Sequence, residues 1–215
     1  YVPGKDVALH PVTLTSSDGG RIYRRSLVML MTTAAAELWP GCRISVRYAV
    51  PDGGFYCTCD SETPFSAEDL QRLEAHMRAI VQNDDPITRR IEPLDEVRTM
   101  YQQRQEFDKV RLLEQRDRDH LVLYTLRGRD DYYYGYMVPS AGYLQVFRLV
   151  DVGDGFILQY PRKEAPAELR TIRAYDKLGA VFQQTDNWLD RLDVEDVGRL
   201  NQVIRDDKRL HELIL

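Results

Sequence analysis

Two stretches in the first third of the chain predict helices of different kinds. Residues 25–39 carry apolar side chains on nearly every face and stop at Pro40-Gly41, which predicts a buried helix. A second helix opens at Ser66 and Asp69, which form a variant of the capping box. Its apolar residues share a single stripe, comprising Leu70, Leu73, Met77, Ile80 and Val81. The stripe predicts that the opposite face of this helix meets water.

Alternating apolar and polar residues predict strands in several places. Residues 44–50 alternate, the turn Pro51-Asp52-Gly53-Gly54 follows, and residues 55–59 continue, which predicts a hairpin. Further strand patterns cover 87–91, 121–126, 144–150 and 155–160. Helical patterns cover 94–102, 107–113 and the chain from Ala167 onward, with breaks near Asn187 and at 193–197. Because no regular βαβ spacing occurs, we expect a two-layer α+β fold with helices packed on an antiparallel sheet.

Three segments are expected along the chain. Residues 1–20 contain two prolines and the run Ser16-Ser17-Asp18-Gly19-Gly20, and are interpreted as an N-terminal arm from a preceding domain. Residues 21–165 form the α+β domain, and 166–215 a helical extension. Tyr1 opens a stretch with neither the basic start nor the apolar centre of a signal peptide. We therefore expect a piece of a longer protein.

Composition narrows the class of protein. The 215 residues carry a net charge of −5, with 43% hydrophobic and 29% charged residues, as in soluble globular proteins. No run approaches the roughly 20 apolar residues that a membrane span needs, so we expect no membrane partner. Three cysteines, an odd number, disfavour a disulfide framework and favour a cytoplasmic location. Cys57 and Cys59 have the spacing of half a metal site, but small strand residues are the favoured interpretation.

Motifs of catalysis and metal binding are missing from the sequence. There is no phosphate-binding G-x-x-x-x-G-K-[ST], no H-E-x-x-H and no G-x-S-x-G. The histidines do not lie three or four residues from one another or from a cysteine; they are His10, His76, His120 and His211. His76 is interpreted as a half-exposed surface residue. The sequence predicts no catalytic residue, no metal and no cofactor in this segment, and an enzyme built on Cys57, Cys59 or His120 is the weakest alternative.

A tyrosine cluster is the most unusual local feature. It surrounds Gly135, follows Arg127 and Arg129, and comprises Tyr132, Tyr133, Tyr134, Tyr136 and Tyr143. Aromatic rings beside arginines can stack on bases or hold a planar ligand. The favoured interpretation is a strand whose alternate tyrosines fill core and rim. The net charge of −5 also lacks the basic footprint of nucleic-acid binding.

Several landmarks resemble a known family in their order along the chain. They are Arg25-Ser26, Glu37-Leu38-Trp39-Pro40, Gly53-Gly54-Phe55-Tyr56, Phe65-Ser66-Ala67-Glu68-Asp69-Leu70, and residues 135–140. This order resembles the second N-terminal, or editing, domain of threonyl-tRNA synthetase, which alanyl-tRNA synthetase and free-standing deacylases share. The resemblance covers roughly residues 20 to 210. It implies the common α+β fold of those domains.

The same resemblance implies where an editing site would lie. The family carries two histidines four apart on the first helix, and a cysteine and a histidine four apart near a later Val-Pro, which together bind zinc or act on a mischarged tRNA. Matching the motifs places Arg25 and Met29 at the first pair, and Tyr133 and Met137 at the second. Arginine has no lone pair to offer, thioethers are weak ligands, and a phenol loses its proton only near pH ~10. The resemblance therefore implies a degenerate editing-type cleft without zinc or catalysis.

A second resemblance concerns the context of the segment. Residues 21–28, 134–140 and 153–156 resemble the N-terminal region of uridine-kinase-like proteins of the phosphoribulokinase/uridine kinase family. In that family a kinase domain follows, which would use ATP and Mg, and residues 200–204 would lead to it. We expect a non-catalytic accessory module whose partner is that kinase domain. The alternatives are a module that binds an RNA end or nucleotide through the Tyr and Arg cleft, and a self-association domain that forms a homo-oligomer.

Overall fold

The computed structural model describes most of the chain. The described residues are 10–60, 64–114, 116–172, 181–182, 184–185, 188–189, 191–192, 194 and 196–206. They form two compact units. One unit comprises Tyr1–Arg89 with Tyr124–Ile172, and the other comprises Arg90–Leu123 with Arg173–Leu215.

Helix α1 (Ser17–Leu38) forms much of the core of the first unit. Its N-cap is Ser16, whose hydroxyl accepts a hydrogen bond from the Gly19 amide at 3.0 Å. A Cβ at Gly19 would lie 2.0 Å from the Thr13 carbonyl oxygen, so only glycine lets the incoming chain pack there. The arm predicted for residues 1–20 is therefore too long, because residues 17–20 are the first turn of α1. Residues 1–9 lie outside the described residues.

Helix α2 (Ala67–Gln82) confirms the predicted capping box. The Ser66 hydroxyl accepts from the Asp69 amide, and the Asp69 carboxylate accepts from the Ser66 amide, each at 3.1 Å. The five residues of the predicted stripe are the buried residues of this helix: Leu70, Leu73, Met77, Ile80 and Val81. Sequence and structure agree here because cap and stripe are both local signals.

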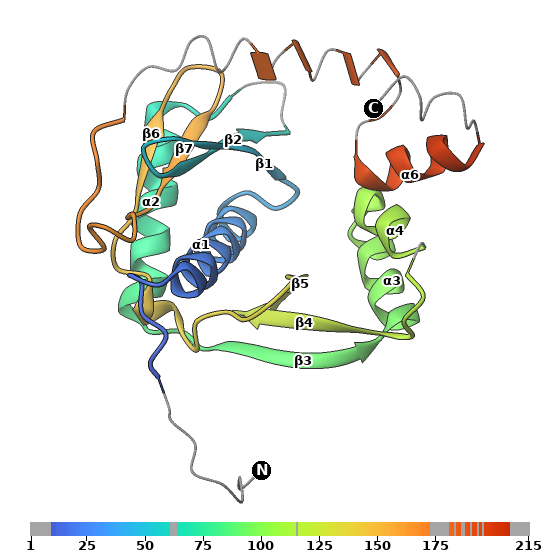
Figure 1. Cartoon of the computed structure of the whole chain (residues 1–215), viewed down its shortest axis with the longest axis horizontal. Coiled ribbons are helices and arrows are strands. Elements are labelled where there is room, and N and C mark those ends of the chain that lie inside the picture. The colour runs from blue at the N-terminus through green and yellow to red at the C-terminus, as the bar shows by residue number, and fades with distance from the viewer. Residues whose placement is uncertain are drawn as a thin grey trace, which may run out of the picture. The chain divides into compact units, whose positions relative to one another are not determined.

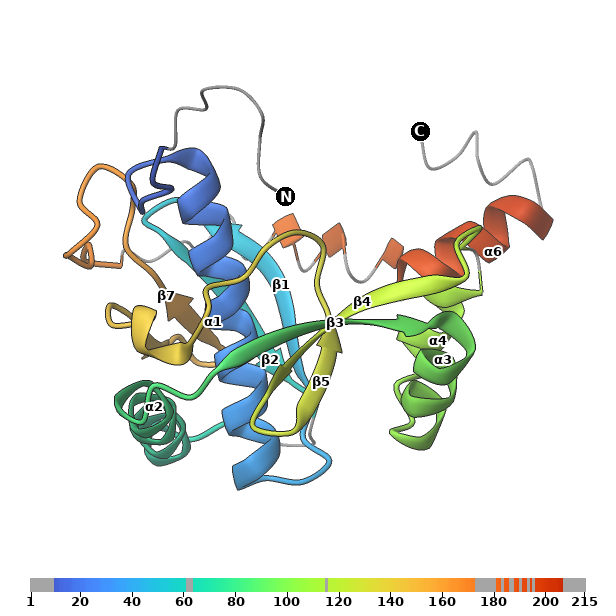
Figure 2. The same ribbon diagram turned by 90° about the horizontal axis from the view of Figure 1, so that it is seen from below.

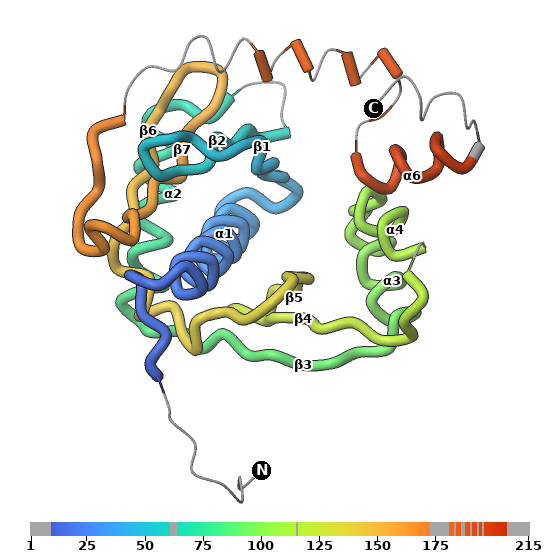
Figure 3. The backbone as a smooth tube through the Cα atoms, viewed as in Figure 1, coloured from blue at the N-terminus to red at the C-terminus, as the bar shows by residue number. Residues whose placement is uncertain are grey.

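A four-stranded antiparallel sheet forms the second layer of this unit. Its order is β1-β2-β7-β6, and its strands are β1 (Ile44–Val50), β2 (Gly54–Cys59), β6 (Arg148–Asp151) and β7 (Phe156–Gln159). Figure 3 shows the two hairpins, β1–β2 and β6–β7, that compose it. Helices α1 and α2 contact each other and α2 contacts β6. Figure 1 shows α1 below the sheet and α2 alongside β6 and β7, and Figure 2 shows the same helices from below. The two-layer α+β fold class is confirmed.

A second sheet was not expected. It has the order β3-β4-β5 and comprises β3 (Ile87–Pro93), β4 (His120–Leu126) and β5 (Arg129–Tyr132). The strand favoured for the tyrosine cluster thus ends at Tyr132, shortly before Gly135 adopts a φ of +101°. The strand predicted for 144–150 begins only at Arg148, after the 3₁₀ turn η1 (Ala141–Tyr143). Leu144 and Phe147 are buried without being in a strand.

The second unit contains helices together with parts of β3 and β4. Helix α3 (Leu94–Gln103) contacts α4 (Phe107–Leu113), and α4 contacts α6 (Val197–Asp206), as Figure 1 shows. Arg111 on α4 pairs with Asp196 just before α6.

The helical extension predicted for 166–215 is only partly correct. Residues 167–172 are not helical, while 181–182, 184–185, 188–189 and α6 are. Helix α6 also begins at Val197, inside the break that we expected at 193–197. Residues 207–215 lie outside the described residues. Among the helices described, none combines the length and apolar character needed to cross a membrane.

Candidate functional site

One of the predicted cleft positions, Arg25, joins α1 to the loop after β5. Arg25 on α1 donates a hydrogen bond from Nη1 to the carbonyl oxygen of Tyr136. Its guanidinium also packs against Gly135, where a Cβ would lie only 3.0 Å from the nearest guanidinium nitrogen. Two features therefore require glycine at position 135: the positive φ of the backbone and the close approach of Arg25. The contact therefore places a positive charge against the backbone of this loop.

Ser26 fixes the other side of the same loop. Its hydroxyl donates to the carbonyl of Ile22 at 2.9 Å and accepts from the amide of Val138 at 2.9 Å. The Met137 sulfur lies 3.7 Å from the same hydroxyl oxygen. Ser26 is fully buried, so it ties residues 137–138 to α1. The sequence alone predicted no separate role for Ser26, although a serine beside Arg25 on an apolar helix was the available signal.

The remaining cleft positions differ in exposure. Met29 lies on α1 and is buried in the core of the first unit. Tyr133 and Met137 lie in the loop after β5 and are half-buried. The set Arg25, Met29, Tyr133 and Met137 contains no imidazole, thiolate or carboxylate, so it does not fit zinc. Within the described part of the chain, no group of three or more His, Cys, Asp or Glu side chains could hold a metal ion.

Three tyrosines of the cluster are exposed to solvent, and none of the five is buried in the core. Tyr134 is 84% exposed, Tyr136 is 73% exposed and Tyr143 is 62% exposed, while Tyr132 is half-buried at the end of β5. The interpretation of this cluster as a strand whose alternate tyrosines fill core and rim is therefore wrong, because β5 ends at Tyr132 and none of the five tyrosines is buried. The Tyr124 hydroxyl donates to the carbonyl of Gly135 at 2.7 Å, and Arg25 holds the carbonyl of Tyr136. The loop backbone is fixed while two of its rings face water.

Arg127 belongs to an ion-pair network instead of the cleft. It donates to Glu37 at the end of α1 at 2.7 Å and to Asp85 at 2.9 Å, and His76 contacts the other Glu37 oxygen at 2.7 Å. Burial raises the pKa of Glu37, but hydrogen bonds from Arg127 and then His76 outweigh it and lower the pKa below 4.5. Arg127 therefore joins elements together, and Arg129 lies half-buried on β5. The expectation of a half-exposed His76 is confirmed, since its side chain is 27% exposed.

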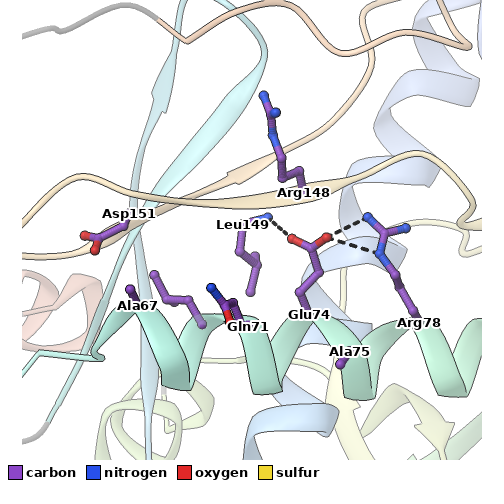
Figure 4. A pocket seen from close by; sticks show the side chains of 9 residues that line it. Ala67, Gln71, Glu74, Ala75, Arg78, Arg148, Leu149 and Asp151 are labelled. Atoms are coloured by element: carbon purple, nitrogen blue, oxygen red, sulfur yellow. Dashed lines mark hydrogen bonds and ion pairs between the residues drawn. The ribbon is translucent and has the colours of Figure 1, made fainter.

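A pocket of about 420 Å³ lies elsewhere, between α2 and β6 (Figure 4). Glu74 lines this pocket, and its carboxylate accepts hydrogen bonds from the Leu149 amide at 2.7 Å and from Arg78 at 2.7 Å. Arg78 also donates to the carbonyl of Phe147 at 2.8 Å and covers the ring of that residue. None of the predicted site residues lines this pocket. The hydrogen bonds of Glu74 and Arg78 described above are made to groups of the protein itself. These two side chains therefore serve to join α2 to β6.

Comparisons with known proteins find threonine–tRNA ligases among the relatives of this chain. The threonine–tRNA ligases of Burkholderia ambifaria and Burkholderia lata are each 33% identical to the chain over 153 residues, which is 71% of this chain and 24% of each relative. This chain carries a threonyl-tRNA-synthetase-like domain. The ligase of Paraburkholderia xenovorans is similar to the same degree, over 152 residues. The chain thus spans about a quarter of the length of these curated relatives. No family model matches it.

Proposed function

We propose that this segment is an editing-type module that has lost its hydrolytic chemistry and serves as a non-catalytic accessory domain. The similarity to threonine–tRNA ligases supports the type of module. The single observation that supports the loss of hydrolytic activity is the position of Arg25. Its guanidinium packs on Gly135 and donates to the Tyr136 carbonyl. A fixed positive charge repels a divalent cation and offers no lone pair to coordinate it.

The neighbouring side chains supply no substitute for a metal. Hydrolysis of an aminoacyl ester needs a water or hydroxyl activated by a base or a metal. The Ser26 hydroxyl donates its only proton to the Ile22 carbonyl, and it is buried beneath the loop. Met29 and Met137 are thioethers and accept no proton at neutral pH. The module therefore holds its shape but activates no water.

Metal analysis of the purified protein tests this proposal. We expect the wild-type chain to contain no stoichiometric zinc after purification in zinc-supplemented buffer. The matched variant carries R25H, M29H, Y133C and M137H, which restores the ligand types of the family, and we expect zinc to bind it. Stoichiometric zinc in the wild-type chain would overturn the proposal, whether or not the variant folds.

The wider context is proposed from the resemblance to uridine-kinase-like proteins. In that context the module precedes a P-loop kinase domain, which binds ATP and Mg and phosphorylates a nucleoside. The chain beyond Leu215 in the natural protein is the cheapest test. We expect G-x-x-x-x-G-K-[ST] there, after a strand and before a helix. Synthetase motifs in that position would contradict this context. A full-length protein without uridine kinase activity would contradict it as well.

A second candidate function is the binding of a single-stranded RNA end, and the exposure of Tyr134 and Tyr136 favours it. Stacking on aromatic rings adds about 1–3 kcal/mol per base, which is enough for measurable binding despite the acidic net charge. We expect a CCA-ended RNA oligonucleotide to bind at low salt. The double variant Y134A/Y136A should weaken binding by about 10-fold or more, while the exposed Tyr143→Ala serves as control.

Two outcomes decide against RNA binding. One is the absence of measurable affinity at low salt. The other is a light-scattering result in which the wild-type protein has a mass larger than that of one chain and the variant Y134A/Y136A has the mass of a monomer. The second result would assign the same exposed rings to self-association, because aromatic side chains are enriched at interfaces between protein chains.

A further inference from the structure

The fold brings together two cysteines that the sequence keeps apart. Cys42 follows the end of α1, after Gly41 with its φ of +92°, and Cys59 is the last residue of β2. Their sulfur atoms lie 2.9 Å apart, and both side chains are partly exposed. This distance is shorter than an ordinary non-bonded contact of about 3.5–4.0 Å and longer than a disulfide bond of about 2.05 Å. The two thiols are within reach of a covalent bond.

Backbone contacts hold both residues in this position. The Cys42 amide donates to the carbonyl of Trp39 at 3.0 Å, which continues the end of α1. Cys59 pairs with Ile44 in the antiparallel ladder of β1 and β2. The next amide, that of Asp60, donates to the carbonyl of Arg43 at 2.8 Å. Because each cysteine is anchored by its own neighbours, a bond between the sulfurs requires only a small movement.

We propose that Cys42 and Cys59 form an intramolecular disulfide when the protein meets a disulfide oxidant such as oxidised glutathione. In the first step the thiolate of one cysteine attacks a sulfur of oxidised glutathione, and one molecule of reduced glutathione leaves. In the second step the other cysteine loses its proton and attacks the protein sulfur of this mixed disulfide. A second reduced glutathione leaves. The protein loses two electrons and two protons, and both appear in the two glutathione thiols.

The local environment keeps Cys42 protonated in the reduced protein. Burial, followed by the adjacent Cys59 thiol and the Asp60 carboxylate, raises the pKa of Cys42 to about 12. Cys42 is therefore a neutral thiol at pH 7, whereas a metal ligand must be deprotonated. A disulfide needs only a transient thiolate, and it would connect the segment after α1 to the end of β2.

Cys57 provides an internal control. It is the third cysteine of the chain, it lies two residues from Cys59 on the same strand, and its side chain is fully buried. Its sulfur contacts the carbonyl of Phe55 at 3.5 Å rather than another thiol. A bond that formed through random collision in unfolded protein would involve Cys57 as often as Cys42. A bond that the fold directs leaves Cys57 reduced.

Thiol titration after incubation with oxidised glutathione tests the proposal. We expect the thiol count measured in denaturant to fall from three to one, and a peptide map to show Cys42 joined to Cys59. The variants C42S and C59S should form no internal bond, whereas C57S should keep it. The oxidised protein should melt at a temperature about 5–10 °C higher, because the bond closes a short loop of the unfolded chain.

Three results would overturn the proposal. They are three free thiols after incubation, a cross-link that includes Cys57, and glutathione adducts on Cys42 or Cys59 without an internal bond. If C57S fails to fold, the peptide map of the wild-type protein still decides between these results, since it identifies which cysteines are joined.

Discussion

Tyr23 shows how a single buried residue holds the first unit together. Its hydroxyl donates to the Val146 carbonyl and accepts from the Val146 amide, each at 2.9 Å. We expect Tyr23→Phe to lower the free energy of unfolding by about 1–3 kcal/mol, because both backbone groups lose their partner. Urea denaturation measures this change. The exposed Tyr134→Phe is the control and should leave stability unchanged.

The same residue predicts a loss of stability in alkali. Burial raises the pKa of Tyr23 to about 12, whereas 10.0 is its ordinary value. A raised folded pKa means that the unfolded chain ionises first, so stability is complete below pH 10 and declines between pH 10 and 12. Denaturation midpoints measured across this range should fall less steeply for Tyr23→Phe than for wild type. Equal slopes for the two proteins would contradict the argument.

Glu37 predicts a loss of stability in acid. Burial opposes its ionised form, but hydrogen bonds from Arg127 and His76 outweigh burial and lower its pKa below the ordinary 4.5. The contribution of Glu37 to stability is therefore present above pH 4.5 and is lost as the pH falls through the lowered value. We expect Glu37→Gln to be less stable than wild type at pH 7 and to lose less stability on acidification. The exposed Glu168→Gln should follow wild type at both pH values.

At the scale of elements, Glu74 joins α2 to β6. Its carboxylate accepts from the Leu149 amide at the start of β6 and from Arg78 one turn further along α2. Glu74→Ala leaves that amide without its partner, so we expect a loss of about 1–3 kcal/mol in unfolding free energy. The exposed Glu68→Ala on the same helix is the control. Equal midpoints for the two variants in urea would show that the contact contributes nothing.

Elements set by local signals could be predicted, and elements set by tertiary contacts could not. The cap at Ser66 and the stripe of α2 lie in adjacent residues, so the sequence contains them fully. The start of α1 was missed because Ser16-Ser17-Asp18-Gly19-Gly20 is typical of a turn, while Gly19 is required by the carbonyl of Thr13. The tyrosine strand was overextended because β-propensity does not reveal that Arg25 demands a glycine at position 135.

At the scale of the whole molecule, the motif order along the chain anticipated more than residue patterns did. Alternation predicted strands but not the order β1-β2-β7-β6, in which β2 pairs with a strand about 100 residues away. The resemblance to a synthetase domain singled out Arg25 and Met137. In the structure Arg25 contacts Gly135 and Tyr136, and Met137 lies beside Ser26. Neither the residue patterns nor the resemblance predicted the contact between Cys42 and Cys59, because that contact depends on where α1 ends relative to the hairpin.

We propose that the synthetase-like module retains its scaffold without hydrolytic chemistry. The most direct measurement is the hydrolysis of a threonine-accepting tRNA charged with serine, a smaller amino acid that a threonine pocket cannot exclude by size. We predict that the chain releases serine no faster than buffer does. Hydrolysis that saturates with substrate and disappears in Arg25→Ala would contradict the account.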